Sequence, residues 1–265
     1  MIRLVGIDVD GTLVGSSGEV HPSVWQAAER ACAAGIHLAL CSGRPAFGLA
    51  LEYARRLDPD GWHIFQNGAS VIDLHAGQSR SVTLPPESVQ TFIDRARHTG
   101  DLLELYSDNA YVSESTSTWA REHAELLGVP FESQAFESLQ GPVVRAQWLL
   151  GAADADRYAA APHPGLEVAL SSSPLMPDTI FVGITRAGVS KGSAMTAVAA
   201  EYGIDPRDVM YVGDAENDLS ALRVVGHPVA MANAARSVLD VAEHTVAHVD
   251  VGGLAQALER AIASR

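Results

Sequence analysis

The sequence predicts an α/β protein with a doubly wound parallel sheet, into which a smaller α+β domain is inserted. Short apolar segments alternate with helix-like segments near both ends of the chain, and this alternation is typical of a parallel sheet with helices on both faces. In the middle of the chain, paired strand-like segments are separated by a tight turn and by helix-like stretches. We therefore expect a core domain in two parts, 1–83 and 188–265, and an α+β cap domain at 84–187.

The first part of the core begins with an apolar, β-branched run at 2–9, which predicts a buried strand that ends in the turn Asp10-Gly11-Thr12. A helix is expected over 22–34, because apolar residues recur at helical spacing and Gly35 follows them, with Ser23 available near its start. The remaining expected elements are a strand at 36–41, a helix at 47–57, a strand at 63–65 and a turn at Asn67-Gly68.

The inserted domain is expected to open with a hairpin, since two strand-like runs at 102–106 and 111–114 flank a Ser-Asp-Asn-Ala turn. Its further expected elements are helices at 118–127 and 155–161 and strands at 143–150, 166–171 and 179–185. The alternation of strand and helix then returns, with helices at 193–202, 219–225 and 251–263 and strands at 209–212 and 228–231.

Composition and charge restrict the classes of function. The 265 residues include 18 basic and 32 acidic side chains, a net charge of −14, and 47% hydrophobic residues, which is typical of a globular protein. An acidic surface repels phosphate backbones, so we expect no nucleic-acid partner, and a phosphorylated ligand would need its charge met locally. Two cysteines cannot build a disulfide framework, and no apolar run is long enough for a signal peptide or a membrane span. We expect a cytoplasmic protein without a membrane partner.

Two carboxylates follow the first predicted strand. Asp8 and Asp10 are two residues apart, so on an extended strand both side chains would point to one face. Two like charges at that distance need a cation or a shared proton. In an open α/β sheet, ligands bind beyond the carboxyl ends of the strands, which is where these acids stand. An ordinary Asp-Gly turn is an equally good reading of this segment taken alone.

Three further segments place polar groups at a strand end or a helix start. Ser42, Gly43 and Arg44 follow the second strand, and a hydroxyl with backbone N–H groups and a guanidinium there could bind an anion, although Ser42 could simply cap a helix. Lys191 precedes an apolar helix, where a cation is unfavourable unless it has an anionic partner. A solvated surface lysine is the alternative.

The last of these segments, 213–218, contains Asp214, Glu216, Asn217 and Asp218 directly after an apolar strand. Such a cluster could bind Mg²⁺, which prefers carboxylates together with water and substrate oxygens. Asp218 alone could instead cap the following helix.

Together these segments resemble the four motifs of the haloacid dehalogenase superfamily, in particular its Cof-type sugar-phosphatase-like branch. The motifs read Asp8-Val9-Asp10-Gly11-Thr12, Cys41-Ser42-Gly43-Arg44-Pro45, Ser190-Lys191-Gly192 and Gly213-Asp214-Ala215-Glu216-Asn217-Asp218, in that order. Asn67-Gly68-Ala69 and Ala230-Met231-Ala232-Asn233-Ala234 also look like that branch, and the insertion lies between the second and third motifs.

The resemblance implies a role for each matching residue. Asp8 would be the nucleophile and Asp10 the general acid and base. The transferring phosphate would be bound by Ser42, Gly43, Arg44, Lys191 and Asn217. Mg²⁺ would be held by Asp8, the backbone carbonyl of Asp10 and Asp214. Thr12 and Asp218 would act indirectly, by holding other groups of the site in place, and Asp218 would orient Lys191 or a metal-bound water.

The resemblance thus implies a Mg²⁺-dependent phosphatase that hydrolyses small phosphorylated metabolites, such as sugar phosphates, through a phosphoaspartate on Asp8. A phosphomutase uses the same motifs, but those of this superfamily usually carry a helical cap between the first two motifs, where this chain has about thirty residues. A non-catalytic sensor of phosphorylated metabolites is the alternative from another class, and it would need neither a nucleophile nor a proton donor.

Overall fold

The computed structural model describes residues 1–173 and 176–264, and their contacts form two compact units. The first unit comprises Met1–Arg44, Ala50–Arg80 and Ser190–Arg265, and the second comprises Pro45–Leu49 and Ser81–Val189. We propose that these units correspond to the core domain and the inserted domain expected from the sequence. Each unit is described by itself.

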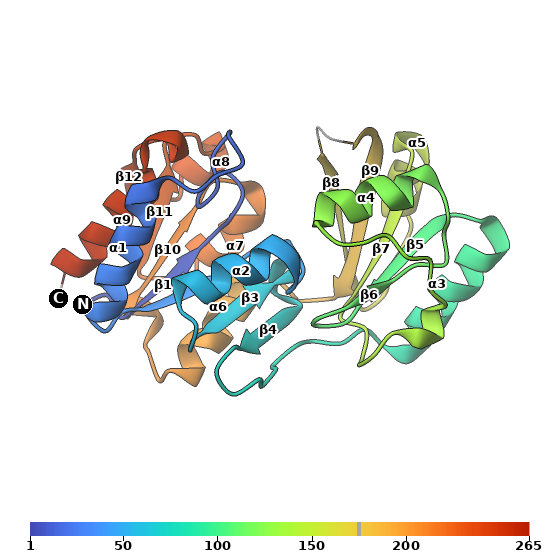
Figure 1. Ribbon diagram of the computed structural model, residues 1–265, viewed down its shortest axis with the longest axis horizontal. Coiled ribbons are helices and arrows are strands. Elements are labelled where there is room, and N and C mark those ends of the chain that lie inside the picture. Colours follow the sequence, from blue (N-terminus) through green and yellow to red (C-terminus); the bar gives the residue numbers. More distant parts are fainter. Residues whose placement is uncertain (174–175, 265) are drawn as a thin grey trace. The chain divides into compact units, whose positions relative to one another are not determined.

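The first unit is built on a five-stranded parallel sheet with the strand order β12-β11-β10-β1-β2 (Figure 1). Its strands are β1 (Leu4–Ile7), β2 (His37–Leu40), β10 (Val209–Gly213), β11 (His227–Met231) and β12 (His244–Val246). β1, β2 and β10 are buried except at His37, and the continuous apolar runs reflect a sheet covered on both faces. This arrangement confirms the predicted α/β fold class.

Helices cover both faces of this sheet. α1 (Pro22–Ala33) and α9 (Gly253–Ala263) pack against each other, and α9 contacts β10, β11 and β12 (Figure 1). On the opposite face, α6 (Lys191–Glu201) and α7 (Leu219–Leu222) share a hydrophobic cluster with alternate residues of the strands, such as Leu4, Ala39 and Tyr211. The shorter elements of the unit are α2 (Gly48–Leu57), α8 (Arg236–Leu239) and the 3-10 turns Gln66–Gly68, Pro206–Asp208, Glu216–Asp218 and Val249–Val251.

The strand expected at 63–65 does not continue the parallel sheet. β3 (Trp62–Phe65) pairs antiparallel with β4 (Ser70–Asp73), and of its residues Ile64 forms a single parallel bridge with Cys41. β4 runs antiparallel to β3 because the turn at Gln66–Gly68 is too short for the crossover that a parallel neighbour requires. Between β2 and β3, the backbone N of Leu40 donates to the Nδ1 of His63 rather than to a backbone carbonyl of β3. β4 itself was not expected from the sequence.

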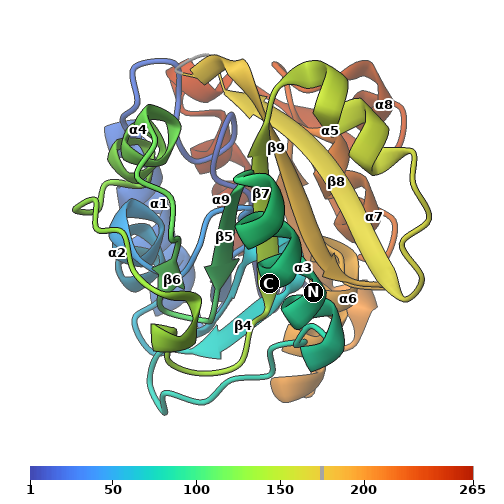
Figure 2. The same ribbon diagram turned by 90° about the vertical axis from the view of Figure 1, so that its right-hand side faces the viewer.

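The second unit contains a five-stranded antiparallel sheet with the order β6-β5-β7-β9-β8 (Figure 2). Its strands are β5 (Leu102–Tyr106), β6 (Tyr111–Val112), β7 (Arg145–Leu150), β8 (Leu166–Ser173) and β9 (Met176–Arg186). α3 (Pro86–Thr99) and α5 (Ala152–Ala159) pack on one face of this sheet, and α4 (Thr118–Leu127) packs on the other. A 3-10 turn at Phe136–Ser138 completes the unit, which has the expected α+β character.

Three details differ from the expected helices: α3 and α8 were not expected, and the cap of α1 differs. α3 was not expected from the sequence, although Val89, Phe92, Ile93 and Ala96 recur at helical spacing, Pro86 starts it and the left-handed Gly100 ends it. α1 is capped by the Nδ1 of His21, which accepts from the backbone N of Ser23, rather than by the Ser23 hydroxyl. Among the described residues, no helix is both long and apolar enough to cross a membrane.

Candidate active site

The four motifs converge at the carboxyl edge of the parallel sheet. Asp8 directly follows β1, Ser42 lies two residues after β2, and Asp214 directly follows β10. Lys191 is the first residue of α6, whose start is fixed by a reciprocal pair of hydrogen bonds between Ser190 and Ser193. Parallel neighbours end at the same edge, so residues about 200 positions apart become neighbours in space.

Lys191 forms a buried ion network with two carboxylates. Its Nζ donates to Oδ1 of Asp8 at 2.5 Å and to Oδ1 of Asp218 at 2.7 Å, and Lys191 is 1% exposed. The alternative of a solvated surface lysine is therefore wrong. Lys191 is also the only lysine among the 18 basic residues of the chain, the other 17 being arginines. A compact ammonium fits between two carboxylates where a planar guanidinium requires more room.

Asp218 holds this network in place from behind. Besides Lys191, its Oδ1 accepts from the hydroxyl of Tyr211 at 2.7 Å, and its Oδ2 accepts from the backbone N–H groups of Asp214 and Ala215 at 3.0 Å each. Both carboxylate oxygens of Asp218 thus accept two hydrogen bonds each, and these contacts hold Asp218 beside Lys191. Tyr211 was not predicted from the sequence, where its position in the strand that leads to Asp214 is the only signal for it.

Asp214 is oriented by two polar side chains. Its Oδ1 accepts from the Thr12 hydroxyl at 3.0 Å, and its Oδ2 lies 3.5 Å from Nδ2 of Asn233. Asn233 also donates to the carbonyl of Gly11 at 2.8 Å. Gly11 has φ +89°, and a Cβ there would lie 2.2 Å from the Asp214 carboxylate, so glycine is required where the first motif turns beside the fourth.

The carboxylates carry more negative charge than Lys191 balances. Burial and the neighbouring charge of Asp218 raise the pKa of Asp8 well above its ordinary value, and the same two causes raise the pKa of Asp214 to about 6. Burial by itself lowers the pKa of Lys191, but the charges of Asp8 and Asp218 outweigh it and the pKa is raised. With all three acids ionised, the group has a formal net charge of −2.

This charge and the donor set fit a divalent metal ion. Asp8, Asp214 and Asp218 each offer a carboxylate oxygen within 4.8 Å of the others, and they form a group that could hold a cation. Because Asp218 already accepts four hydrogen bonds, Asp8 and Asp214 are the better available ligands. Hard oxygen donors of this kind suit Mg²⁺.

Asp10 lies differently from the expectation that its side chain would share a face with that of Asp8. β1 ends at Ile7, so the two acids are not on one regular strand, and Asp10 is exposed whereas Asp8 is buried. The Asp10 carboxylate accepts two hydrogen bonds from Arg44, at 3.0 Å from Nε and 2.5 Å from a terminal nitrogen. Arg44, expected to contact phosphate, is thus engaged by a carboxylate in this structure.

The loop after β2 is the candidate anion site. The Ser42 hydroxyl accepts from the backbone N of Arg44 at 3.0 Å, and its backbone carbonyl accepts from the backbone N of Asn67 at 2.9 Å. α2 begins only at Gly48, so Ser42 does not cap that helix. Asn217 is exposed, and its Nδ2 donates to Oδ1 of Asn67 at 3.0 Å.

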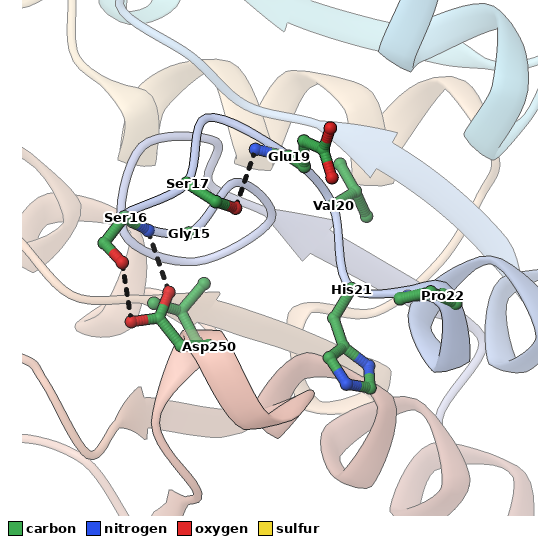
Figure 3. Close-up of a pocket in the computed structure, with 9 residues that line it drawn as sticks. Gly15, Ser16, Ser17, Glu19, Val20, His21, Pro22 and Asp250 are labelled. Carbon is green, nitrogen blue, oxygen red and sulfur yellow. Dashed lines mark hydrogen bonds between the residues drawn. The ribbon is translucent and has the colours of Figure 1, made fainter.

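A pocket of about 330 Å³ lies in the same unit but outside this cluster (Figure 3). It is formed by the loop between β1 and α1, at residues 15–22, together with Val249 and Asp250. Asp250 accepts from the backbone N and the hydroxyl of Ser16 at 2.8 and 2.9 Å. Since its described lining includes no residue of the four motifs, we do not assign the pocket to the candidate site.

Comparisons with known proteins agree with the motif geometry. A model of the family described as haloacid dehalogenase-like hydrolase matches residues 5–258. The Bacillus subtilis (strain 168) protein YxeH, named as a candidate phosphatase, is 28% identical over 94% of this chain and 97% of its own length. The HMP-PP phosphatase of Serratia proteamaculans (strain 568) is 25% identical over 88% of this chain and 85% of its own.

Solved structures show the same fold. A haloacid dehalogenase-like hydrolase from Bacteroides thetaiotaomicron superposes with a TM-score of 0.86 at 24% identity, covering 98% of this chain and 99% of its own. The sugar phosphatase BT4131, described as subclass IIB of the superfamily, superposes with a TM-score of 0.79 at 22% identity, covering 97% and 98%. These findings confirm the predicted resemblance and the prediction of an enzyme. The chain belongs to the family of haloacid dehalogenase-like hydrolases.

Proposed function

We propose that this protein is a Mg²⁺-dependent phosphatase that hydrolyses small phosphorylated metabolites, such as sugar phosphates, through a phosphoaspartate on Asp8. The observation that carries the proposal is the group of Asp8, Asp214 and Asp218 beside one buried lysine, in which Asp8 and Asp218 are buried and Asp214 is half-buried. Its excess of negative charge calls for a metal ion, and its lysine is already placed beside the proposed nucleophile.

In the proposed reaction, an Asp8 oxygen attacks phosphorus, the new O–P bond forms and the bond to the leaving oxygen breaks. Lys191, together with Ser42 and the N–H groups of its loop, would bind the phosphoryl oxygens and offset the repulsion between carboxylate and phosphate. Mg²⁺, held by Asp8, Asp214 and the backbone carbonyl of Asp10, would supply further charge stabilisation.

Asp10 would donate a proton to the leaving oxygen and then accept one from the water that breaks the Asp8–phosphorus bond. General acid–base catalysis of this type contributes about 10²–10⁴ in rate. For this role the Asp10 carboxyl must separate from Arg44, and a phosphate dianion that binds the guanidinium supplies a reason for that exchange. Thr12 and Asp218 would keep Asp214 and Lys191 oriented.

The proposed substrate class is supported by the names of relatives, which include a sugar phosphatase and an HMP-PP phosphatase. The net charge of −14 is in keeping with free metabolites in the cytoplasm rather than with a nucleic acid or a membrane surface. Side chains of the inserted domain would then select the substrate. The segment between Asp10 and Ser42 contains α1 and β2 of the first unit, where phosphomutases of this superfamily usually carry a helical cap. It therefore does not support the phosphomutase alternative.

The test is phosphate release from p-nitrophenyl phosphate with and without Mg²⁺. We expect Asp8→Asn to lower turnover by at least about 10³-fold, because the nucleophile is lost, and EDTA to abolish turnover reversibly. Asp240→Asn, an exposed acid paired with Arg236, is the matched control and should retain wild-type turnover. Turnover by Asp8→Asn equal to that of wild type would falsify the mechanism, and no turnover by wild type would favour a non-catalytic sensor.

A further inference from the structure

The turn Gln66–Gly68 is the most strained backbone segment of the described chain. Among the described residues, Gln66 and Asn67 are the two non-glycine residues with positive φ, at 53° and 55°, and Gly68 follows at 103°. Left-handed conformations are unfavourable for a non-glycine residue, and they persist only where surrounding contacts enforce them. None of these three residues has an assigned role in the proposed reaction.

The contacts that enforce this turn come first from the second motif. The backbone N of Gln66 donates to the carbonyl of Arg44 at 3.0 Å, and the backbone N of Asn67 donates to the carbonyl of Ser42 at 2.9 Å. A Cβ on Gly43 would lie 3.2 Å from the amide of Asn67, so the two segments are in close contact. The turn therefore fixes the path of the loop that carries Ser42.

The same turn contacts the third and fourth motifs. A Cβ on Gly68 would lie 2.3 Å from the carbonyl oxygen of Ser190, the residue before Lys191. The Asn67 Oδ1 accepts from Nδ2 of Asn217 at 3.0 Å. One three-residue turn thus touches every motif that is expected to bind the phosphoryl group.

We infer that the turn Gln66–Gly68 is a positioning element for the phosphate site, in which Asn67 orients the amide of Asn217 and Gly68 sets the distance to the start of α6. The inference rests on the proposed function, since it assumes that these motifs bind phosphate. Asn67 acts through Asn217 and Ser42 and is a positioning residue. The left-handed backbone keeps its side chain directed at Asn217.

The first test compares inorganic phosphate binding, measured by calorimetry in the presence of Mg²⁺, with thermal stability. Asn67→Gly removes the amide but keeps a residue that adopts positive φ easily. We expect the phosphate dissociation constant to rise about tenfold while the melting temperature stays within about 2 °C of wild type. A dissociation constant within twofold of wild type would overturn the role of Asn67.

The second test asks whether Asn67 acts through Asn217. We expect Asn217→Ala to weaken phosphate binding, and the double variant to bind no more weakly than Asn217→Ala, because both substitutions remove one shared contact. Fully additive losses would contradict that pathway.

The third test isolates the close approach at Gly68. Gly203 also has positive φ, at 60°, but a Cβ there would meet no atom within 4 Å, so Gly203→Ala strains the backbone without a clash. We expect Gly68→Ala to weaken phosphate binding at least tenfold relative to Gly203→Ala. Equal binding by the two variants would overturn the inference for Gly68. Phosphate binding without turnover in wild type would overturn the proposed function alone, whereas no phosphate binding would overturn this inference.

Discussion

Among its described residues, each unit of this protein contains a largely buried polar cluster, and the two clusters are built on opposite principles. The core cluster comprises Asp8, Asp214, Asp218 and Lys191. The second-unit cluster comprises Glu104, Tyr106, His123 and Gln147, all with 6% exposure or less. Both contain ionisable groups that are costly to bury. The hydrogen bonds of each cluster therefore indicate whether its role is in folding or in function.

The second-unit cluster is satisfied around a single acid. One oxygen of Glu104 accepts from the Tyr106 hydroxyl at 2.5 Å and from Nε2 of Gln147 at 3.1 Å, and the other lies 2.8 Å from Nδ1 of His123. Arg145 stacks on the Tyr106 ring at 4.2 Å. Tyr106, His123 and Gln147 each form a hydrogen bond with Glu104, as is typical of a network that specifies packing.

The core cluster instead gathers three acids around one cation. Burial, and after it the charge of Asp218, raises the pKa values of Asp8 and Asp214, and three carboxyl groups share one ammonium group. Such an arrangement costs stability and is typical of a functional site that binds a cation or reacts. The comparison indicates that excess charge, rather than burial of polar groups, distinguishes the candidate active site.

The largest expected effect is that of replacing the only lysine. Lys191→Arg keeps the charge but introduces a wider, planar group between Asp8 and Asp218, so we expect turnover of p-nitrophenyl phosphate to fall by about 10³-fold. Arg236→Lys, on the surface of α8, is the matched control and should retain wild-type turnover. Wild-type kinetics for Lys191→Arg would show that the network tolerates either cation and would weaken the comparison.

Substitutions in the second-unit cluster should lower the stability of the protein rather than its turnover. Glu104→Gln places a second amide opposite Gln147, so we expect the free energy of unfolding to fall by about 3 kcal/mol, measured by denaturant titration. Turnover per folded molecule of p-nitrophenyl phosphate should stay within about threefold of wild type. A loss comparable to that of Lys191→Arg would mean that both clusters serve the reaction.

A pH effect on stability is expected from His63, which is fully buried in the first unit. Its Nδ1 accepts from the backbone N of Leu40 at 3.0 Å, and burial lowers its pKa to about 4. The unfolded state takes up a proton near pH 6.5 and the folded state only near pH 4, so stability is lost as pH falls through that window. We expect the advantage of wild type over His63→Asn to shrink by about 3 kcal/mol across it. A constant difference would show that His63 does not titrate in this way.

The smallest expected effect concerns Tyr211, which was found only in the structure. Tyr211→Phe removes one hydrogen bond to Asp218 and keeps the ring that packs beside Gly6. We expect kcat to fall about tenfold with little change in KM, because a hydrogen bond to a charged group contributes about 1.5–3 kcal/mol. Tyr202→Phe loses a comparable bond to the backbone N of Trp62, away from the motifs, and should leave kcat unchanged. Equal effects of the two variants would reduce Tyr211 to a packing residue.

Much of the fold could be predicted because its elements are local. Residues that are close together along the chain show the apolar runs of β1, β2 and β10 and the helical periodicity of α1 and α9. β4 was missed because four residues are too few to show a pattern, and α3 because its few apolar residues stand among many polar ones, although they recur at helical spacing. Tertiary packing decided those elements.

The sequence by itself determined which residues could react: the acids and the small and cationic residues of four ordered motifs are chemically recognisable wherever the chain places them. The structure alone decided how they are paired. In the structure, Lys191 is buried between Asp8 and Asp218, and Asp10 pairs with Arg44. Tyr211, Asn233 and Asn67 form hydrogen bonds with residues of the motifs. The physical reason is that these contacts join positions that are far apart in the sequence, whereas periodicity and turn chemistry report only on neighbours along the chain.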